Sequence, residues 1–450
     1  MKIKGIGICP PPGAQNNFSV TPELLASCLA RYSRSNKGID SILASIDWNN
    51  PDKSVDSIFR FVDYGHASIT GMTGGIAIVI DGCSMFLAYK LFEIAQLCDG
   101  QESSTRYIKM DRSNLQDPSV LGIPQELIPE WESMMEQAFT IYHELYDKLD
   151  KQIRDNPDLI RYPSGSGPKV IDRLRKNYAL DRSRYFIPFA TKTNAAFVMT
   201  ARAWADTIKQ LESIPLMEAR ECASGIRKEL AKYVPRMIKH SYADEASITQ
   251  TKFAFDNPVN LMKESGINIG NLKDEVFLQI EQQWPPFIPK SQSIHDSFLG
   301  KSNRYSLTGN SIKRIFVRAA WNNMAIAELR DLNRHRSGYR FSTLCPQGFY
   351  LPEGVDHPDR SKLLNRQKAF LEKLLQTDSC YSFVYGFFLG TQVCFEHSTH
   401  LDKLIYEIEL RTGSGAHFRY AEHLYTAYRK LIAEIPELES HINIGTAEPE

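Results

Sequence analysis

Apolar and polar residues alternate at two periods along the first half of the chain, and each period predicts its own kind of element. Residues 75–81 are a short β-branched run between glycines, which predicts a buried strand, and a helix is expected from residue 85 to about 97. Over residues 125–155 apolar side chains recur every three or four positions, which predicts one long amphipathic helix. A strand running into a helix is predicted for residues 190–203, and another amphipathic helix for residues 215–233.

The order of elements recurs in the second half. We predict an apolar-rich helix over residues 315–332, an Arg-rich turn, an amphipathic helix over 363–375, a strand-like segment over 382–395, and helices up to residue 436. The stretch between the halves, from about residue 240 to 301, is less periodic.

This recurrence predicts an α+β fold made of two diverged tandem copies. The expected boundaries are residues 1–245 for the first unit, 246–300 for a connecting region, and 301–450 for a second, more diverged unit. A chain of 450 residues is long enough for two domains with cores of their own.

Composition excludes several classes of protein. The formal net charge is zero, so no global field favours nucleic acid or acidic membranes. No apolar run approaches eighteen residues, and the first residues do not read as a secretion signal, so we expect a cytoplasmic protein. None of the eight cysteines forms a CxxC pair, and we predict neither a disulfide framework nor a metal site.

The densest cationic cluster is Arg334-His335-Arg336, which follows a predicted helix and precedes Ser337 and Ser342. Arginine side chains offer fork-shaped donors that match phosphate oxygens. The alternative is a solvated basic helix end, which the helix dipole favours. Residues from Cys394 to His400 include three possible zinc ligands, but a strand running into a helix would not align them.

The triplet resembles the signature of the flavin-dependent thymidylate synthases, in which Arg-His-Arg is followed after seven residues by a Ser that leads into Ser-x-Arg-Tyr. The resemblance extends over residues 25–240 and, more thinly, over residues 305–437. The segments that carry it are Gly65-His66-Ala67-Ser68, Gln101-Glu102-Ser103-Ser104-Thr105-Arg106-Tyr107, Arg184 to Thr191, Met199 to Arg202, Met217 to Arg220, and Leu410-Arg411-Thr412.

The chain departs from that family in both halves. In the first half, Glu93-Ile94-Ala95 stands where Arg-His-Arg is expected, and Leu211 replaces the last nucleotide-binding Arg. In the second half, Leu344 lies seven residues after Arg336, Asp402 replaces a flavin-facing Arg, and Gly386 is assigned to the position of Arg184. The losses are complementary, so we expect one composite class of site in a homodimer that acts as a pseudo-tetramer.

The resemblance implies FAD as cofactor and the methylation of dUMP to dTMP with methylenetetrahydrofolate and NADPH. It implies that Ser103, Arg106 and Arg411 serve catalysis, and that Ser104, Arg106, Arg184 and Arg411 bind the nucleotide. It also implies that the flavin is bound by His66, Ser68, Arg202, Arg334, His335 and Arg336. Two alternatives stay open: a flavin-dependent reaction on another pyrimidine nucleotide, and a catalytically silent homologue that binds nucleotide or a partner.

Overall fold

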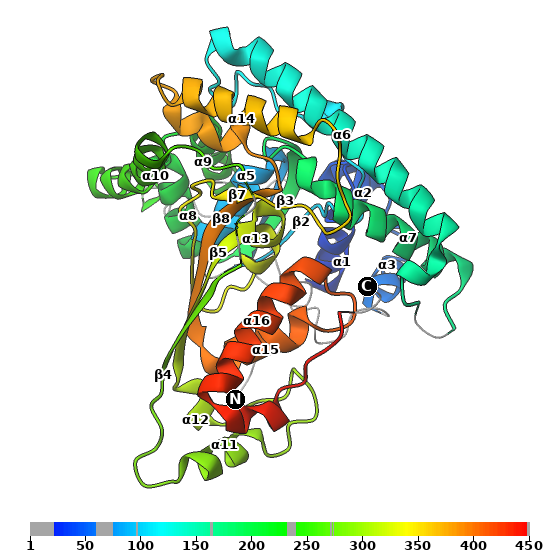
Figure 1. The fold of residues 1–450 in the computed structure, drawn as a ribbon, viewed down its shortest axis with the longest axis vertical. Coiled ribbons are helices and arrows are strands. Elements are labelled where there is room, and N and C mark those ends of the chain that lie inside the picture. Colours follow the sequence, from blue (N-terminus) through cyan, green and yellow to red (C-terminus); the bar gives the residue numbers. More distant parts are fainter. Residues whose placement is uncertain are drawn as a thin grey trace. The chain divides into compact units, whose positions relative to one another are not determined.

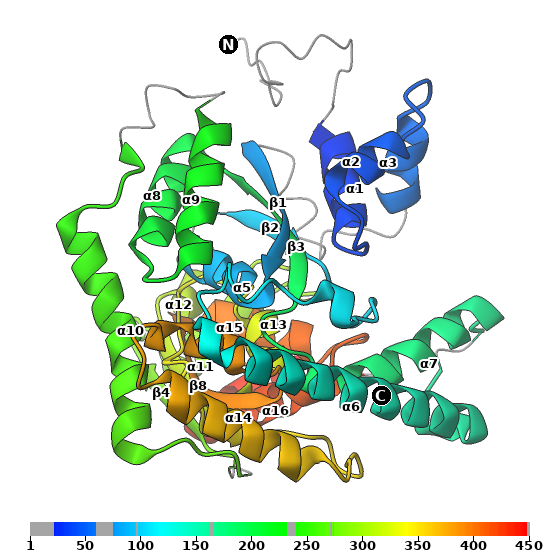
Figure 2. The ribbon, with the colours of Figure 1, turned by 90° about the horizontal axis from the view of Figure 1, so that it is seen from above.

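The computed structural model describes residues 22–59, 75–95, 98–162, 165–231, 240–270, 272 and 274–447 (Figures 1 and 2). The chain forms two compact units, each made of three segments. Unit 1 comprises the chain up to Glu136, Pro188–Lys263 and Ala369–Phe387. Unit 2 comprises Gln137–Ile187, Glu264–Lys368 and Phe388–Glu450.

Unit 1 is built on a three-stranded antiparallel sheet. Its strands are β1 (Ile76–Ser84), β2 (Asp99–Glu102) and β3 (Lys192–Met199), in the order β1-β3-β2. Because successive side chains of a strand point to opposite faces, the side chains of β3 pack on both faces of the sheet. Ala196 and Val198 pack into one apolar cluster with the N-terminal helices, while the Phe197 ring meets Phe92, in the helix that follows β1, at 4.6 Å between centroids.

Helices cover both faces of this sheet (Figure 2). The N-terminal group is α1 (Pro22–Tyr32), α2 (Ile39–Ala44) and α3 (Asp52–Phe59). The other group is α5 (Met85–Ile94), α8 (Ala201–Ser213) and α9 (Met217–Leu230), and α10 (Glu245–Ser265) follows it in the chain. Trp204 of α8 is fully buried and donates from its indole N–H to the Ile76 carbonyl at 2.8 Å, which fastens this helix to the sheet.

Unit 2 is built on a larger antiparallel sheet of order β4-β5-β8-β6, with β7 pairing β8 (Figure 1). Its strands are β4 (Val276–Glu281), β5 (Phe316–Ala325), β6 (Tyr339–Phe341), β7 (Gly348–Phe349) and β8 (Thr391–His400). Its helices include α11 (Lys290–Phe298), α12 (Asn310–Lys313), α13 (Ile326–Leu332), α15 (Leu401–Arg411) and α16 (Phe418–Glu434). Trp321 of β5 donates to the His423 carbonyl of α16 at 3.2 Å.

The second series of elements, β5 to α16, follows the same order as the first, β1 to α9. In both, a strand runs into a helix, and a later strand pairs with the first and runs into two more helices. The N–H of Phe86 donates to the Phe189 carbonyl, as the N–H of Ala327 does to that of Leu389. Phe189 therefore matches Leu389. The same offset in residue number makes Val384 the match of Arg184. The assignment of Gly386 to that position is wrong by two residues.

The two series exchange equivalent segments between the units. The connection from β2 to β3 includes α6 (Ile128–Asp155), α7 (Pro168–Ser183) and the 3-10 turn η5 (Arg184–Phe186), and its residues 137–187 belong to unit 2. The matching connection includes α14 (Arg360–Leu374) and the 3-10 turn η7 (Cys380–Gly386), and its residues 369–387 belong to unit 1. The predicted units at 1–245 and 301–450 are continuous in sequence and do not capture this exchange.

Backbone hydrogen bonds mark where each exchanged segment ends. In unit 1 the N–H of Phe189 donates to the Phe387 carbonyl at 2.8 Å, and in unit 2 that of Leu389 donates to the Ile187 carbonyl at 2.9 Å. The described residues also form the 3-10 turns η2 (Arg112–Asn114), η3 (Gln125–Leu127), η4 (Pro157–Leu159) and η8 (Pro436–His441). Among the described residues, no helix combines the length and apolar character that crossing a lipid bilayer requires.

Three expectations are corrected. Residues 315–332 are not one helix, because β5 runs without a break into the short α13. Residues 382–395 are not one strand, because their first part is the 3-10 turn η7 and β8 starts at Thr391. The less periodic stretch 246–300 is not only a connection, since it holds most of α10 as well as β4, which adds to the sheet of unit 2.

Candidate functional site

The Arg-His-Arg triplet lies in unit 2, in the turn between α13 and β6. The helix ends at Leu332, whose carbonyl accepts the N–H of His335 at 3.0 Å. Gly338 closes the turn with φ of 106°, and a Cβ there would lie 2.2 Å from the Ser398 carbonyl oxygen, so a larger residue would clash. The triplet is thereby held at the C-terminal end of a helix, where the dipole favours cations.

Two side chains of β8 fasten this turn. The ring of His397 is buried, with Nδ1 at 2.9 Å from Glu407 Oε2 and Nε2 at 3.1 Å from the Ser337 carbonyl, to which Thr399 also donates at 2.6 Å. Burial would raise the pKa of Glu407, but the imidazoles of His335 and His397 hold it below its usual range. The two ring nitrogens of His397 therefore bridge the Glu407 carboxylate and the backbone of the turn.

His335 and Arg411 form one hydrogen-bonded pair. The Nε of Arg411 donates to His335 Nε2 at 2.7 Å, and its Nη2 donates to the Asp331 carbonyl at 3.1 Å. Loss of solvent around the ring lowers the pKa of His335 to about 3. The imidazole is therefore neutral near pH 7, with Nε2 accepting and the proton on Nδ1. The structure thus brings two of the predicted site residues into contact.

Arg334 and Arg336 flank His335 in this turn and are half-buried. Each guanidinium is permanently charged and donates in a plane, which suits a phosphate or a pyrophosphate. A neutral imidazole between them adds a flat surface without further charge. The donor set of the turn therefore fits an anionic ligand with a planar group.

Arg184 reaches unit 2 through the exchanged segment. Its side chain is 2% exposed, with Nη2 at 3.2 Å from Glu328 Oε1 and Nη1 at 3.6 Å from Asp331 Oδ2. The hydroxyl of Tyr185 donates to the same Glu328 oxygen at 2.8 Å. Burial opposes the charge of Arg184, but Asp331 and Glu328 outweigh it and raise its pKa. Burial likewise raises the pKa of Glu328, to about 6, against the effect of Arg184.

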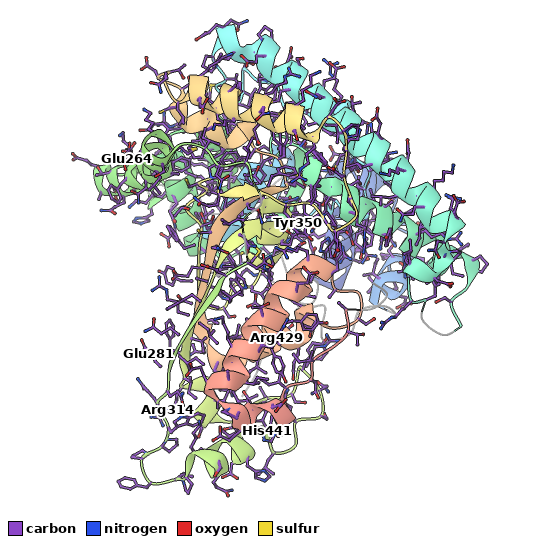
Figure 3. All side chains as sticks on the ribbon, in the orientation of Figure 1. Glu264, Glu281, Arg314, Tyr350, Arg429 and His441 are labelled. Carbon is purple, nitrogen blue, oxygen red and sulfur yellow. The ribbon has the colours of Figure 1, made fainter. Side chains whose placement is uncertain are left out.

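A second arginine belongs to the same polar cluster. Arg419 of α16 holds Asp274 through two hydrogen bonds, at 2.9 and 3.2 Å, and lies over the ring of Tyr350, which is labelled in Figure 3. The Tyr350 ring in turn meets Tyr185 edge-on at 4.9 Å between centroids. The neighbourhood of Arg184 is therefore packed by charged and aromatic groups of its own unit.

The predicted nucleotide residues of the first half lie in unit 1, after β2. Ser103 is fully buried, and its hydroxyl donates to the Ser35 carbonyl at 3.3 Å. Ser104 is partly exposed, and its Oγ accepts the N–H of Arg106 at 3.3 Å. The matching positions of unit 2, found from the pairing of β2 with β3 and of β6 with β8, hold Leu344 and Pro346 in place of Ser104 and Arg106. Unit 2 therefore lacks this serine and arginine.

Three predicted flavin-binding residues cannot be placed. His66 and Ser68 lie outside the described residues, and the side chain of Arg202, near the start of α8, is also outside them.

The position that matches Arg334 is Glu93, near the end of α5. This carboxylate pairs with Lys90 and accepts the hydroxyl of Tyr89 at 2.7 Å. The end of this helix is therefore occupied by an internal ion pair instead of a cationic triplet.

A buried carboxylate organises unit 1. Glu218 of α9 accepts the N–H of Ser84 at 2.7 Å, the Ser84 hydroxyl at 2.6 Å and the Tyr385 hydroxyl at 2.8 Å. Burial raises the pKa of Tyr385 well above its usual range, so the phenol keeps its proton. Tyr385 lies in the exchanged segment and matches Tyr185, which donates to Glu328 in unit 2. Each exchanged segment thus delivers one buried tyrosine to one buried glutamate.

Sequence reasoning missed the roles of Glu328, Glu407 and His397. A signal was present for the two acids, because each stands among apolar residues whose face is buried, between Ala327 and Leu329 and beside Ile408. A charged side chain is almost never fully buried unless it is paired. The partner of Glu328 could not be found, since Arg184 is 144 residues away, and that of Glu407 could not because His397 lies on a strand and Glu407 on the following helix.

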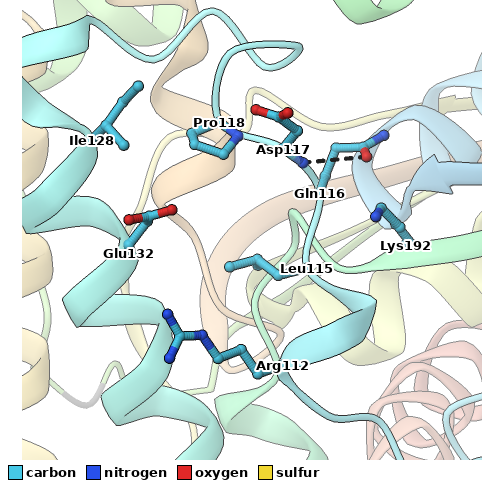
Figure 4. Close-up of a pocket in the computed structure, with 8 residues that line it drawn as sticks. All are labelled: Arg112, Leu115, Gln116, Asp117, Pro118, Ile128, Glu132 and Lys192. Atoms are coloured by element: carbon cyan, nitrogen blue, oxygen red, sulfur yellow. Dashed lines mark hydrogen bonds between the residues drawn. The ribbon is translucent and has the colours of Figure 1, made fainter.

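Unit 1 also contains a cavity of about 460 Å³, within the range of small-ligand sites (Figure 4). It is lined by Arg112, Leu115, Gln116, Asp117, Pro118, Ile128, Glu132 and Lys192. Gln116 connects it to the Glu218 network, because its side-chain N–H donates to Glu218 Oε1 at 3.4 Å. Charges of both signs surround the opening, so its lining does not favour a highly charged anion.

Comparison with known proteins gives two findings. Residues 18–236 match the family model described as thymidylate synthase complementing protein. The chain is also similar to the UPF0159 protein Ta1429 of Thermoplasma acidophilum, with 22% identity over 469 residues, 91% of this chain and 93% of that protein. The second match extends through both series of elements.

Proposed function

The chain belongs to the thymidylate synthase complementing protein family through residues 18–236, and from this premise we propose that it is a flavin-dependent enzyme that methylates a pyrimidine nucleotide. The proposed reaction converts dUMP to dTMP, with FAD as cofactor, methylenetetrahydrofolate as one-carbon donor and NADPH as reductant. The family match supports a thymidylate synthase-like activity. The specific substrates and cofactor are our proposal.

The observation that carries the proposal is the fixed Arg-His-Arg turn of unit 2. Its two arginines are half-buried, and the turn that carries them is held by the helix end, by His397 at Ser337 and by Arg411 at His335. A site whose cations are already positioned binds an anion without ordering them first. Arg334 and Arg336 would hold phosphate oxygens, and the neutral ring of His335 would lie against a planar group.

FAD, when bound, would supply the redox chemistry, while the protein positions the reactants. The chain's own part is to hold charge and exclude water. Arg411 is oriented by His335 and by the Asp331 carbonyl, and the ring of His397 fixes the turn. Ser104 and Arg106 of unit 1 would contact the nucleotide in a composite site, as the sequence predicts.

We also propose that the two series are diverged tandem copies and that the chain acts as a homodimer equivalent to a tetramer of single copies. The common strand order and the exchange of equivalent segments support the duplication. Light scattering during gel filtration tests the dimer, which should have twice the mass of the chain. A monomer at micromolar concentration would contradict it.

A second candidate is a flavin-dependent reaction on a different pyrimidine nucleotide. Two features of unit 2 favour this candidate, because each changes the charge that a nucleotide would meet. Pro346 stands at the position that matches Arg106, and the Glu328 carboxylate lies beside Arg184. Rescue of a thymidine-requiring bacterium separates the two candidates. Growth supports dUMP methylation, and repeated failure with well-expressed protein supports the other substrate.

The enzyme proposal itself is tested by the visible spectrum of purified protein with added FAD. We expect a retained flavin band that Arg336→Ala abolishes. Arg429→Ala is the matched control, because Arg429 is an exposed arginine of the same unit on α16, labelled in Figure 3. Protein that stays colourless after addition of FAD would refute both enzyme candidates and leave the silent, nucleotide-binding homologue.

A further inference from the structure

The sheet of unit 2 has an outer face that carries exposed aromatic side chains. Helices α15 and α16 pack on the inner face of this sheet (Figure 1). The outer face carries Phe277, Tyr339 and Phe341, whose side chains are 53%, 76% and 53% exposed. A cavity of about 270 Å³ lies on the outer face, and Phe277 and Phe341 line it. Exposed apolar groups gathered around a cavity mark a binding site more often than scattered ones do.

The register of the strands sets the walls and the floor of this cavity. Phe277 of β4 pairs with Ala320 of β5. Glu396 of β8 pairs with Ala320 on one side and with Phe341 of β6 on the other. Neighbouring strands lie about 4.8 Å apart, so the two phenylalanines stand about 14 Å apart in this row. The cavity therefore has an aromatic side chain at each end and the methyl group of Ala320 in its floor.

The charged groups of the cavity are carboxylates. Glu275 and Glu396 line it, and none of the described lining residues is a cation. Glu396 already pairs with Arg318 at 2.5 Å, whereas the Glu275 carboxylate has no side-chain partner among the described residues. An anionic ligand would be repelled here, while aromatic faces beside a carboxylate attract a cation.

The matching place in unit 1 is filled by an aromatic ring of the chain itself. Asp81 matches Asn322, and Ala196 matches Glu396, and both of these residues of unit 2 line the cavity. Tyr32, at the end of α1, is fully buried in the apolar cluster that includes Ala196. Its hydroxyl bonds to the Asp81 carboxylate. A phenol therefore occupies in unit 1 the place that stays open in unit 2.

The rest of the outer face does not suit a group of helices like α1 to α3. Those helices pack against Ala77 and Ala196 in unit 1. The matching positions of unit 2 hold Arg318 and Glu396, which form an ion pair. Covering this pair with helices would remove its water at a cost that the attraction of the two charges does not fully offset. The apolar part of the face is thus the cavity alone, which is the size of a small ligand.

We propose that this cavity binds an arylalkylamine, a small molecule with a flat aromatic ring and a protonated amino group. The ring would lie over Ala320 between Phe277 and Phe341, and the ammonium group would pair with Glu275. None of the lining residues belongs to the Arg-His-Arg turn. The proposal therefore goes beyond the proposed function and does not depend on it.

The experiment uses tyramine as the probe, because it combines the phenol of a tyrosine side chain with an ammonium group. Cys394 lines the cavity and is exposed, so its alkylation in the full chain reports occupancy by peptide mass spectrometry. A ligand of this size has a Kd on the order of 1 mM or below. We expect about 5 mM tyramine to slow alkylation of Cys394 at least about fivefold by mass action. The control compound is 4-hydroxyphenylacetate, which has the same ring with a carboxylate in place of the amine and should give no protection.

Two variants with matched controls test the contacts. Phe341→Ala removes one wall and should weaken tyramine binding at least about fivefold. Tyr339→Ala is its control, because Tyr339 is an exposed aromatic residue of the same strand and face that does not line the cavity. Glu275→Gln should also weaken binding, and Glu281→Gln, at an exposed carboxylate of the same strand, should not. All four side chains are exposed, so these variants are expected to fold.

Three outcomes would overturn the proposal. The first is unchanged alkylation of Cys394 in tyramine. The second is equal protection by 4-hydroxyphenylacetate, or an equal loss in Phe341→Ala and Tyr339→Ala. The third is alkylation that slows as the protein concentration rises without any ligand, which would assign the outer face to a second copy of the chain. Protection by tyramine in protein that takes up no FAD would leave the proposal standing while the proposed function fails.

Discussion

The ion pair between Arg184 and Glu328 predicts a strong energetic coupling. The exposed fractions are 2% and zero, so solvent screens neither charge. Removing one partner of a buried pair costs about 3–5 kcal/mol, whereas replacing both by apolar residues is often neutral or stabilising. The cost of Glu328→Leu should lie near the lower end of that range, because Asp331 still faces Arg184 at 3.6 Å. Arg184→Val leaves a buried carboxylate that can take up a proton, which also limits its cost.

The double variant Arg184→Val with Glu328→Leu installs the pair that unit 1 carries at these positions. We expect each single change to lower the free energy of unfolding by about 3 kcal/mol and the double change by about 1 kcal/mol or less. The coupling energy is then several kcal/mol, larger than most pairs of neighbours show.

Hydrogen exchange of the α13 amides is the appropriate assay, because it reports the opening of unit 2 separately from unit 1. Glu422→Gln is the control, since this carboxylate is largely exposed and should contribute less than about 1 kcal/mol. Additive single changes, with a coupling below about 0.5 kcal/mol, would show that the two side chains do not stabilise each other and would refute the reasoning.

Three further predictions concern single groups. Because burial raises the pKa of Glu328 from 4.5 to about 6, the folded chain binds this proton more tightly than the unfolded chain does. Its contribution therefore lowers the free energy of unfolding by about 2 kcal/mol as pH rises from 4.5 to 6.5, and Glu328→Gln should flatten urea-unfolding profiles there. His397→Ala removes the ring that bridges Glu407 and the Ser337 carbonyl, so exchange of the turn amides should accelerate at least tenfold; unchanged exchange would argue against that bridging role. Tyr385→Phe should destabilise unit 1 by about 1.5–3 kcal/mol, because a buried carboxylate loses a donor, and a cost below about 0.5 kcal/mol would contradict that role of Glu218.

The elements with an uninterrupted period could be predicted from sequence. The strand at residues 75–81 and the helix at 125–155 are present as β1 and α6. The burial of α6 follows the period of its pattern, whereas β1 lies at the edge of its sheet and most of its predicted buried run is only partly buried. β5 was not predicted because no glycine or proline marks the junction between Ala325, the last residue of the strand, and Ile326, the first of the helix. Strand and helix therefore read as one apolar run. The 3-10 turn η7 resembled a strand because its aromatic residues alternate, although most of them are buried by packing on several sides.

The candidate site was predictable only in part. Arg334, His335 and Arg336 form a local motif, and their place at a helix end follows from the residues around them. The contact of His335 with Arg411 joins positions far apart in the chain, and a family resemblance could name both residues without showing that they touch. Glu328 could not be assigned to Arg184 from sequence at all, because 144 residues separate them and no periodicity reports such a pair.

The exchange of segments ties the core of each unit to both series of elements. Each unit needs a tyrosine from the other series, Tyr385 for Glu218 and Tyr185 for Glu328, so neither series can lose its exchanged segment without leaving a buried carboxylate short of a donor. That requirement preserves the packing while the surrounding charges change. The neighbouring positions show this: Arg184 pairs with Glu328 of α13 in unit 2, whereas the matching residues of unit 1, Val384 and Leu87, are both apolar and buried. The contact between tyrosine and glutamate is therefore kept in both units without a neighbouring ion pair in unit 1.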